Sequence, residues 1–370
     1  MNTEPVSVID DVSAVQTVDT RNMLRLINEL PEQFETALGI ARYLAVEERE
    51  QQPSMIYLTG SGSSANAVDL AAAVLNEETD LPIVVSHAPR VPKCVGEGSL
   101  AIVVDYAGKS EISLRNYREA RSRGAEMVCV TSGGALLEEA VADGSLTVRV
   151  PPGQPPRTAP GYQMVPPLIL AERMGLTQSL SERLAHAIKG MKNAREWLRV
   201  EYPSARNIAK RAAETMAGKL VVIYGAADYR DAVARRWRSQ INANSKALAV
   251  TDVFQDVAET GISGWTTAER QCGGLAVVLL GDPGDKGEIA DTVKACRRRL
   301  EGYNPIDIDM QGATTLEKML YGVYVGDYVS YYLALLHGVD PTLVADLSEP
   351  EPEPAPDSDT DATDELLSSE

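Results

Sequence analysis

The stretch Met55-Ile-Tyr-Leu-Thr-Gly60-Ser-Gly-Ser-Ser64-Ala65 places a short apolar run directly before a loop of glycine and serine. Residues 65–76 then have the apolar spacing of a helix. A second stretch, Ala101-Ile-Val-Val-Asp-Tyr106-Ala-Gly-Lys-Ser110-Glu-Ile-Ser113-Leu114, repeats the pattern. Both stretches predict a strand that ends in a tight turn at the start of a helix.

Such a turn offers unpaired backbone N–H groups at a helix N-terminus, with hydroxyl groups beside them. This combination binds phosphate without a metal ion. A glycine that follows a strand often serves only the turn, so one loop alone is a weak indication. Two such loops, after Gly60 and at Gly108, favour one phosphate bound from both.

Strand and helix patterns alternate through the first half of the chain. Strands are predicted at residues 55–59, 82–86, 100–106, 126–131 and 146–150, and helices at residues 21–49, 65–76, 112–123 and 136–143. Short apolar strands separated by amphipathic helices are typical of a parallel sheet covered on both faces. Ligands of such sheets bind where the carboxyl ends of the strands meet the next helices, which is where both loops lie.

The pattern begins again after a charged helical stretch near residues 183–197. Strands are predicted at residues 219–224, 247–251, 274–280 and 305–309, and a last helix at residues 315–337. We therefore expect an α/β fold of two tandem units, residues 21–178 and 179–347, each a mostly parallel sheet between helices in three flavodoxin-like layers. The last helix is rich in tyrosine, which predicts a packing face whose polar tips reach a surface or a dimer interface. These tyrosines are Tyr321, Tyr324, Tyr328, Tyr331 and Tyr332.

Composition argues against several classes of protein. The chain has 370 residues, 44% of them hydrophobic, and no apolar run near ~18 residues, so no membrane-spanning segment is expected. The net charge of −18, from 53 acidic and 35 basic residues, argues against nucleic acid or an anionic membrane as a partner, because both are polyanions. The acidic surface and the excess of arginine over lysine are also typical of a protein from a halophilic archaeon.

Both ends of the chain are expected to lie outside the folded units. The start, Met1-Asn2-Thr3-Glu4-Pro5, has neither region of an export signal, which predicts a cytoplasmic protein. Residues 1–20 form a polar leader that we expect to be disordered. Residues 348–370 are acidic and contain no Lys or Arg, so a disordered acidic tail is expected there.

Five stretches of the sequence, in order, carry a resemblance to a known family. The chain resembles the sugar isomerase (SIS) superfamily and, more closely, the archaeal-type bifunctional phosphoglucose/phosphomannose isomerases. The resemblance implies a homodimer of two-SIS-domain subunits that binds a hexose 6-phosphate in the first domain and moves a proton between C1 and C2. It implies no cofactor and no metal. The stretches are Gly60–Asp69, Tyr106–Leu114, Thr131–Leu136 with Pro156-Arg157, Arg236–Lys246 and Gly338–Pro341.

The resemblance also assigns the phosphate-binding residues. In the first loop they are Gly62, Ser63 and Ser64, and in the second they are Gly108, Lys109, Ser110 and Ser113. Lys109 stands where the family has an amide. Its charge either pairs with a phosphate dianion or reaches solvent, and the sequence favours neither.

The resemblance gives Arg157 the role of stabilising the negative charge of an enediolate, which a fixed guanidinium does well. The family's proton-transferring glutamate is replaced by Ala243, and its ring-opening histidine aligns with Glu259. The family's C-terminal lysine has no counterpart after Lys318. An acid/base group typically contributes ~10²–10⁴-fold to such a reaction, so these replacements put the standard mechanism in question.

Two hypotheses follow. In one, the protein is a phosphosugar isomerase that uses the family's reaction or an altered one. Arg157 then stabilises the enediolate and Glu259 is the base, with Asp256 a weaker candidate for the base. In the other, it is a catalytically silent phosphosugar-binding protein, either a sensor or a partner subunit. Among the histidines, only His87 follows a strand end near the expected site.

Two further classes fit poorly. An amidotransferase-linked synthase needs an N-terminal glutaminase segment with a leading cysteine, which the sequence does not contain. A nicotinamide dehydrogenase needs a third glycine in the first loop and an acidic residue after the next strand, where His87 stands instead.

Overall fold

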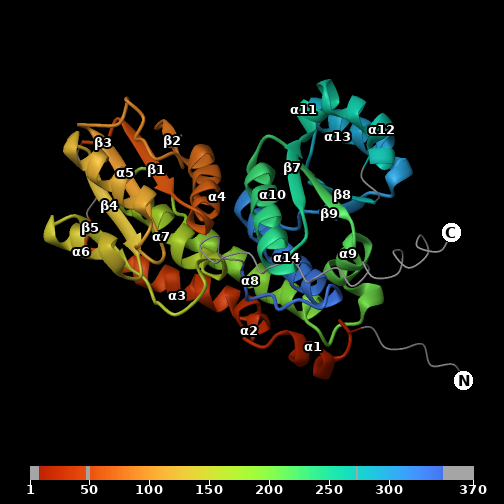
Figure 1. The fold of residues 1–370 in the computed structure, drawn as a ribbon. Helices are drawn as coiled ribbons and strands as arrows, with labels where there is room; N and C mark the ends of the chain where they lie inside the picture. Colours follow the sequence, from red (N-terminus) through yellow and green to blue (C-terminus); the bar gives the residue numbers. More distant parts are fainter. Residues whose placement is uncertain (1–7, 47–50, 272–273, 345–370) are drawn as a thin grey trace, which may run out of the picture.

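The computed structural model describes residues 8–46, 51–271 and 274–344 as two α/β units joined by a layer of helices (Figure 1). In the described part of the chain the first sheet has the strand order β2-β1-β3-β4-β5 and the second β7-β6-β8-β9. All neighbouring strands are parallel, as predicted. The strands are β1 (Met55–Gly60), β2 (Ile83–Val85), β3 (Ser99–Val104), β4 (Glu126–Thr131), β5 (Leu146–Arg149), β6 (Leu220–Gly225), β7 (Ala249–Val253), β8 (Leu275–Gly281) and β9 (Ile306–Asp309).

Helices precede, separate and follow these strands. They are α1 (Val12–Val18), α2 (Met23–Asn28), α3 (Leu30–Arg42), α4 (Ser63–Glu78), α5 (Glu111–Ser122), α6 (Gly134–Ala142), α7 (Pro160–Arg173), α8 (Ser181–Leu198), α9 (Ile208–Met216), α10 (Tyr229–Gln240), α11 (Phe254–Glu259), α12 (Trp265–Gln271), α13 (Gly287–Arg299) and α14 (Thr315–Leu336). A 3₁₀ turn, Pro156–Thr158, leads into α7, and a π-helical turn, Ile241–Ser245, follows α10.

The first sheet is covered on both faces because successive side chains of a strand point in opposite directions. On β1, Ile56 and Leu58 belong to the core cluster that contains α4 and α7, whereas Tyr57 packs with α5 and α6. The second sheet has the same arrangement, with Tyr224 facing α11 and α13.

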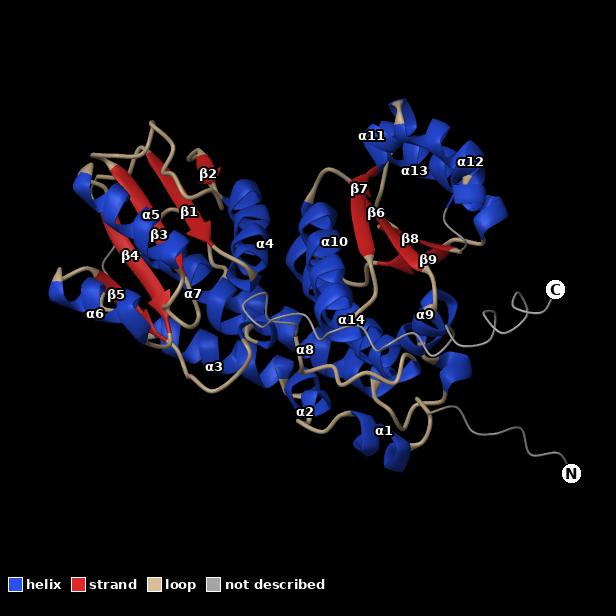
Figure 2. Ribbon diagram, viewed as in Figure 1, coloured by secondary structure: helices blue, strands red, loops and turns tan. Residues whose placement is uncertain are grey.

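The two units share one continuous core. Buried residues of both sheets belong to the same cluster, in which α14 and α8 are the common elements. Figure 2 shows α8 and α14 in the layer between the sheets. The boundary expected near residue 178 therefore falls between α7 and α8, although the core does not end there.

The leader is more structured than expected. Ile9 is fully buried, Val15 is 2% exposed, and residues 12–18 form α1, capped by Asp11. Asp10 forms a 2.7 Å ion pair with Lys210, whose ammonium is otherwise buried. The prediction of a disordered segment at residues 1–20 is therefore wrong for residues 8–20, because a few apolar side chains and one ion pair fix a short helix.

The helix predicted at residues 21–49 is two helices. α2 ends at Asn28, and α3 starts at Leu30 with Pro31 in its first turn. Proline has no N–H and suits the start of a helix, so Pro31 favours a new helix over continuation of the old one. Residues 47–50 lie outside the described residues.

α7 was not predicted because Pro166 and Pro167 lie inside it. The helix is nevertheless almost wholly buried between α3 and α4, and this packing outweighs the hydrogen bonds that the prolines cannot donate.

The tyrosine face of α14 is internal. Tyr324 donates to the carbonyl O of Asn28 at 3.2 Å, Tyr331 donates to Asp19 at 3.1 Å, and Tyr328 and Tyr332 donate to Asn28 and Leu198. These hydroxyls therefore dock α14 onto the end of α1, onto α2 and onto α8 of the same chain.

The predicted acidic tail, residues 348–370, lies outside the described residues. Among the helices that the structure describes, none combines the length and the apolar character needed to cross a bilayer.

Candidate functional site

The loops after β1 and β3 meet because the two strands are parallel neighbours. Gly60 pairs with Val104, so the chain leaves both strands at one edge of the sheet. The approach is close: a Cβ on Gly60 would lie 2.9 Å from the carbonyl O of Val104. Gly108 has φ +66°, and a Cβ there would lie 1.8 Å from the carbonyl O of Gly133. Glycine is therefore required at both positions.

Three serine hydroxyls gather between the two loops. Ser61 Oγ donates to Ser110 Oγ at 2.6 Å and lies 3.3 Å from Ser113 Oγ. Hydroxyl groups rotate to donate or accept, so this cluster can turn its hydrogens toward an anion. The two loops thus present hydroxyls at one place.

The N-terminus of α4 is open. Its N-cap residue, Gly62, has φ +56° and no side chain caps the helix. Ser64 N and Ala65 N donate to carbonyls of the preceding turn, whereas the N–H of Ser63 donates to none of the described residues. An anion at this end would gain the Ser63 N–H as a donor and the favourable end of the helix dipole.

The second loop contributes hydroxyls and a cation, but few backbone donors. The carboxylate of Asp105 accepts from Gly108 N at 3.1 Å and from Ser110 N at 2.8 Å, and Ser110 Oγ accepts from Ser113 N at 3.3 Å. Lys109 is exposed and pairs with no carboxylate among the described residues. Gly108 therefore has a structural role in the loop rather than a free N–H.

Ser64 is differently placed from the expectation. It is 3% exposed, its Oγ donates to Gln163 Oε1 at 2.6 Å, and it accepts from Tyr106 N at 3.3 Å. Its hydroxyl is thus satisfied inside the protein. Sequence reasoning missed Ser61, which directly follows the last residue of β1 and therefore faces the neighbouring loop.

The corresponding loop of the second unit is closed to anions. α10 is capped by Asp228, whose carboxylate accepts from Arg230 N at 2.8 Å and pairs with the Arg230 guanidinium at 2.7 Å. A carboxylate already occupies the helix N-terminus, and its charge repels phosphate. Of these two corresponding loops, the one in the first unit is suited to bind phosphate.

A cleft of about 810 Å³ opens beside the first loop and is lined by both units. Gly62, Ser63 and Asn66 of α4 form one wall, and Ser239 reaches from α10 to within 3.3 Å of Asn66 Oδ1. None of the described lining residues is Asp, Glu or His. The remaining lining residues are Arg238, Asn242, Ala243, Ala249, Val250, Thr251 and Val344.

Arg157 lies at the junction of the two units. Its Nε donates to Asn244 Oδ1 at 2.8 Å, and its Nη2 donates to the carbonyls of Pro341 and Thr342 at 3.0 and 2.7 Å. Burial lowers the pKa of Arg157, although a guanidinium remains charged at any ordinary pH. Asn244 follows Ala243 in the chain, so this cation is anchored beside the wall of the cleft.

A buried ion pair supports the same loop. Arg236 donates to Asp327 at 2.6 Å and to the carbonyl O of Arg157 at 3.3 Å, and Gln240 donates to Asp327 at 3.0 Å. Lys246 donates to the carbonyls of Asn244 and Asp340 at 3.0 and 2.6 Å. Partial burial and the charge of Arg157 lower the pKa of Lys246.

Glu259 does not join these residues within one chain. It is the exposed last residue of α11, which packs against α13 and β7. In Figure 1, α11 lies at the outer end of the second unit, away from α4. Asp256, the weaker candidate, is on the same helix.

His87 stands behind the first loop. Its Nδ1 lies 3.0 Å from the carbonyl O of Gly60 and its Nε2 lies 2.9 Å from Asp69 Oδ1. The hydrogen bond to Asp69 raises the pKa of His87, since both ring nitrogens face acceptors. His87 therefore supports the loop from β1 to α4 and is turned toward protein groups.

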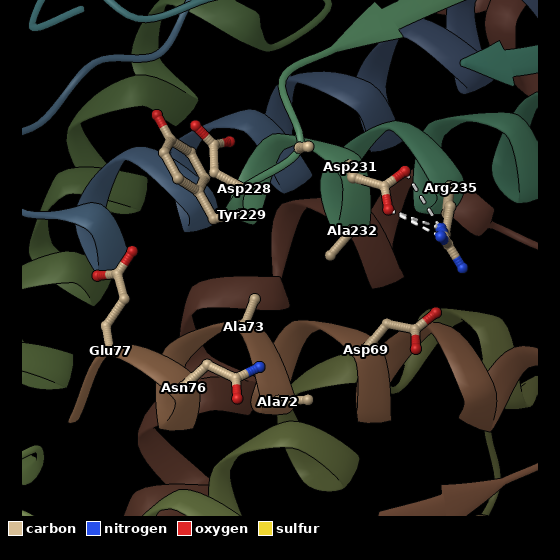
Figure 3. Close-up of a pocket in the computed structure, with 11 residues that line it drawn as sticks. Asp69, Ala72, Ala73, Asn76, Glu77, Asp228, Tyr229, Asp231, Ala232 and Arg235 are labelled. Carbon is tan, nitrogen blue, oxygen red and sulfur yellow. Dashed lines mark hydrogen bonds and ion pairs between the residues drawn. The ribbon is translucent and has the colours of Figure 1, made fainter. Parts of the chain in front are cut away.

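A separate groove of about 490 Å³ lies between α4 and the start of α10 (Figure 3). Its charged residues are mainly acidic: Asp69, Glu77, Asp228 and Asp231, with Arg235 paired to Asp231 at 2.8 Å. This groove disfavours a phosphate. No group of His, Cys, Asp and Glu within the described ranges is arranged to hold a metal ion.

Known proteins resemble this chain over most of its length. The family described as "Bacterial phospho-glucose isomerase C-terminal SIS domain" matches residues 205–349. A bifunctional phosphoglucose/phosphomannose isomerase of Caldicellulosiruptor bescii is 31% identical over 87% of this chain and 96% of its own. The enzyme of the same name from Aquifex aeolicus is 28% identical over 78% of this chain and 87% of its own.

Solved structures share the fold. A glucose-6-phosphate isomerase-like protein of Thermus thermophilus has a TM-score of 0.56 at 21% identity, covering 92% of this chain and 99% of its own. The C-terminal domain of glucosamine-fructose-6-phosphate aminotransferase from Francisella tularensis has a TM-score of 0.65 at 15% identity, covering 86% and 97%. The two parallel sheets are thus tandem SIS domains, as predicted.

Proposed function

Because this chain belongs to the family of bifunctional phosphoglucose/phosphomannose isomerases, we propose that it binds a hexose 6-phosphate and interconverts its aldose and ketose forms. One observation carries the proposal. The cleft lined by Gly62 and Ser63, next to the serine cluster, is also lined by Asn242 and Ala243. A single ligand can therefore have its phosphate at the open end of α4 and its carbon chain between the two units.

The chemistry follows from this placement. The phosphate accepts hydrogen bonds from Ser61, Ser110 and the start of α4, and Lys109 adds a positive charge. A base removes the proton from C2 of the aldose, and the carbonyl oxygen at C1 becomes an enediolate oxygen. The hydroxyl proton then passes from O2 to O1 and the base returns its proton to C1, so that the carbonyl group stands at C2. Arg157, already fixed by Asn244, supplies the positive charge that the enediolate needs.

The base is the part of the mechanism that the described residues of a single chain do not supply. The described lining of the cleft contains no carboxylate or imidazole, and Glu259 lies on α11. We propose a homodimer in which Glu259 of one subunit completes the cleft of the other. One subunit then binds the phosphate and stabilises the enediolate, and its partner supplies the base. The residues of the first subunit are Gly62, Ser63, Ser110, Ser113, Lys109 and Arg157.

A second candidate function is favoured by one specific observation. Ala243 lines the cleft and cannot take a proton. A protein with this cleft and no base supplied from elsewhere binds a phosphosugar without converting it, as a sensor or a partner subunit does.

Hydrogen exchange at C2 separates the two functions. The purified protein is incubated with glucose 6-phosphate, mannose 6-phosphate or fructose 6-phosphate in deuterated buffer at low and high salt, and deuterium at C2 is measured by NMR. The isomerase is supported if the wild type exchanges deuterium and Glu259→Gln abolishes this exchange. The control, Glu214→Gln on the exposed face of α9, should leave the exchange intact. Binding of the same sugars without any exchange supports the silent protein.

We propose a cytoplasmic protein whose ligand is a small phosphosugar and which binds neither nucleic acid nor membrane. The net charge of −18 supports this, since polyanions are repelled. If the acidic excess is a halophilic adaptation, exchange is greater in the high-salt arm.

A further inference from the structure

One charged side chain, without an ion-pair partner among the described residues, lies in the described lining of the cleft. Among the described residues that line the cleft, Arg238 is the only one with an acidic or basic side chain. It is exposed on the last turn of α10 and forms no ion pair within the part of the chain that the structure describes. A guanidinium in a cleft of donors and neutral side chains has an anion as its natural ligand.

The opposite wall is where the proposed function puts the phosphate. Gly62 and Ser63 line the same cleft as Arg238, and they form the open start of α4. The walls are close here, since Ser239, the residue after Arg238, has its Oγ 3.3 Å from Asn66 Oδ1. A long side chain one residue earlier on the rim of this cleft has room to turn toward α4.

We propose that Arg238 is a phosphate ligand supplied by the second unit. This inference rests on the proposed function, because it assumes that a phosphosugar occupies the cleft. The planar fork of arginine matches two phosphate oxygens, so the phosphate is held between the serine loops of the first unit and Arg238 of the second. The bound phosphate then links the two walls of the cleft.

The helix itself supplies a matched control. Arg235 lies three residues earlier on α10, is also exposed, and pairs with Asp231 in the acidic groove of Figure 3. The two arginines share a helix and a charge, but only Arg238 lines the cleft. Loss of either changes the net charge equally, so a difference between them reports the local contact.

The test measures binding by calorimetry with inorganic phosphate, glucose 6-phosphate and unphosphorylated glucose as probes. Because Arg238→Gln removes hydrogen bonds between charged groups, we expect it to raise the Kd for phosphate and glucose 6-phosphate about 10- to 100-fold. Arg238→Lys recovers part of the affinity, because it keeps the charge but not the fork. Arg235→Gln leaves the Kd near the wild-type value.

The outcomes are distinct. If Arg238→Gln binds both phosphate-containing probes as the wild type does, or if Arg235→Gln weakens them equally, the inference is overturned and the proposed function stands. If the wild type binds none of the probes and shows no exchange at C2, the proposed function fails and the inference fails with it.

Discussion

The Nε of Arg157 donates a 2.8 Å hydrogen bond to Oδ1 of Asn244, a residue 87 positions later in the chain. This contact joins the loop before α7 in the first unit to the π-helical turn that carries Ala243 in the second. The same guanidinium donates to the carbonyls of Pro341 and Thr342, so its position is fixed from two sides. A cation held in place before the reaction stabilises developing negative charge without reorganisation.

Arg157→Gln is therefore expected to lower kcat by about 10²–10³-fold and to change KM little, because the missing charge acts on the enediolate rather than on the bound sugar. Steady-state isomerisation of fructose 6-phosphate measures the effect. Arg173→Gln is the control, since Arg173 also donates to backbone carbonyls, those of Arg42 and Val46, but lies away from the cleft. Equal losses in both variants would mean that Arg157 serves only to dock the chain.

Replacement by alanine should have different effects at Ser61 and Ser64, the two serines that follow β1. At Ser61 it should change KM, and at Ser64 it should change stability. Ser61→Ala removes a hydroxyl of the serine cluster and should raise KM for the phosphosugar about 10-fold, with little change in stability. Ser64→Ala leaves the buried Gln163 Oε1 without its donor and should lower the free energy of unfolding by about 1–3 kcal/mol. Urea unfolding and KM for each variant distinguish the two. The reverse pattern would return Ser64 to the phosphate site.

The strands and the two loops were predictable because they depend on local patterns. Runs such as β1 and β3 are short and apolar and end at glycine or at a polar turn. The parallel pairing of neighbours then requires their loops to meet at one edge of the sheet. The last helix was predictable for the same reason, although its tyrosines pack inside the chain.

What could not be predicted depends on distant contacts. Ser64 is turned away from the cluster by Gln163, which is 99 residues later, and α7 forms around Pro166 and Pro167 because it is buried on all sides. The second wall of the cleft comes from α10 and β7. No pattern around Gly62 contains that information.

The pH dependence of stability should include a contribution from His87. Its hydrogen bond with Asp69 raises its pKa above the ordinary value near 6.5. A raised pKa means that the folded state favours the protonated ring, so this contribution is full below about pH 6.5 and is lost as the pH rises through the folded-state pKa. Partial burial of the ring and the charge of Arg235 both oppose protonation and limit the gain.

The expected size is about 1 kcal/mol or less, because the pair is partly exposed. The free energies of unfolding of wild type and His87→Gln are compared between pH 5.5 and pH 9. The difference between the two proteins should shrink as the pH rises. His186→Gln is the control, since His186 is exposed and bonds to no described residue. A difference that stays constant or grows with pH contradicts the assignment.

Ala243→Glu is expected to add a base to the cleft. Ala243 lines the cleft two residues before Ser245 and directly before Asn244, the partner of Arg157. The cleft is open to water and has Arg238 as its charged lining residue, so an introduced carboxylate stays ionised at neutral pH. A general base within reach of the reacting carbons contributes ~10²–10⁴-fold, and exchange at C2 should rise at least about 10-fold over wild type.

Ala243→Gln, which has the same size but cannot take a proton, controls for filling the cleft and should show no gain. Placing Ala243→Glu in a Glu259→Gln background removes any base supplied by a second subunit, so exchange in this double variant must come from the introduced carboxylate. The contrary outcome is that neither Ala243→Glu nor the double variant exchanges deuterium faster than the parent protein that keeps Ala243, while both variants still bind glucose 6-phosphate. The reacting carbons then do not lie beside residue 243. The sugar would then extend from the serine cluster in another direction, and the placement of C1 and C2 between the two units would have to be abandoned.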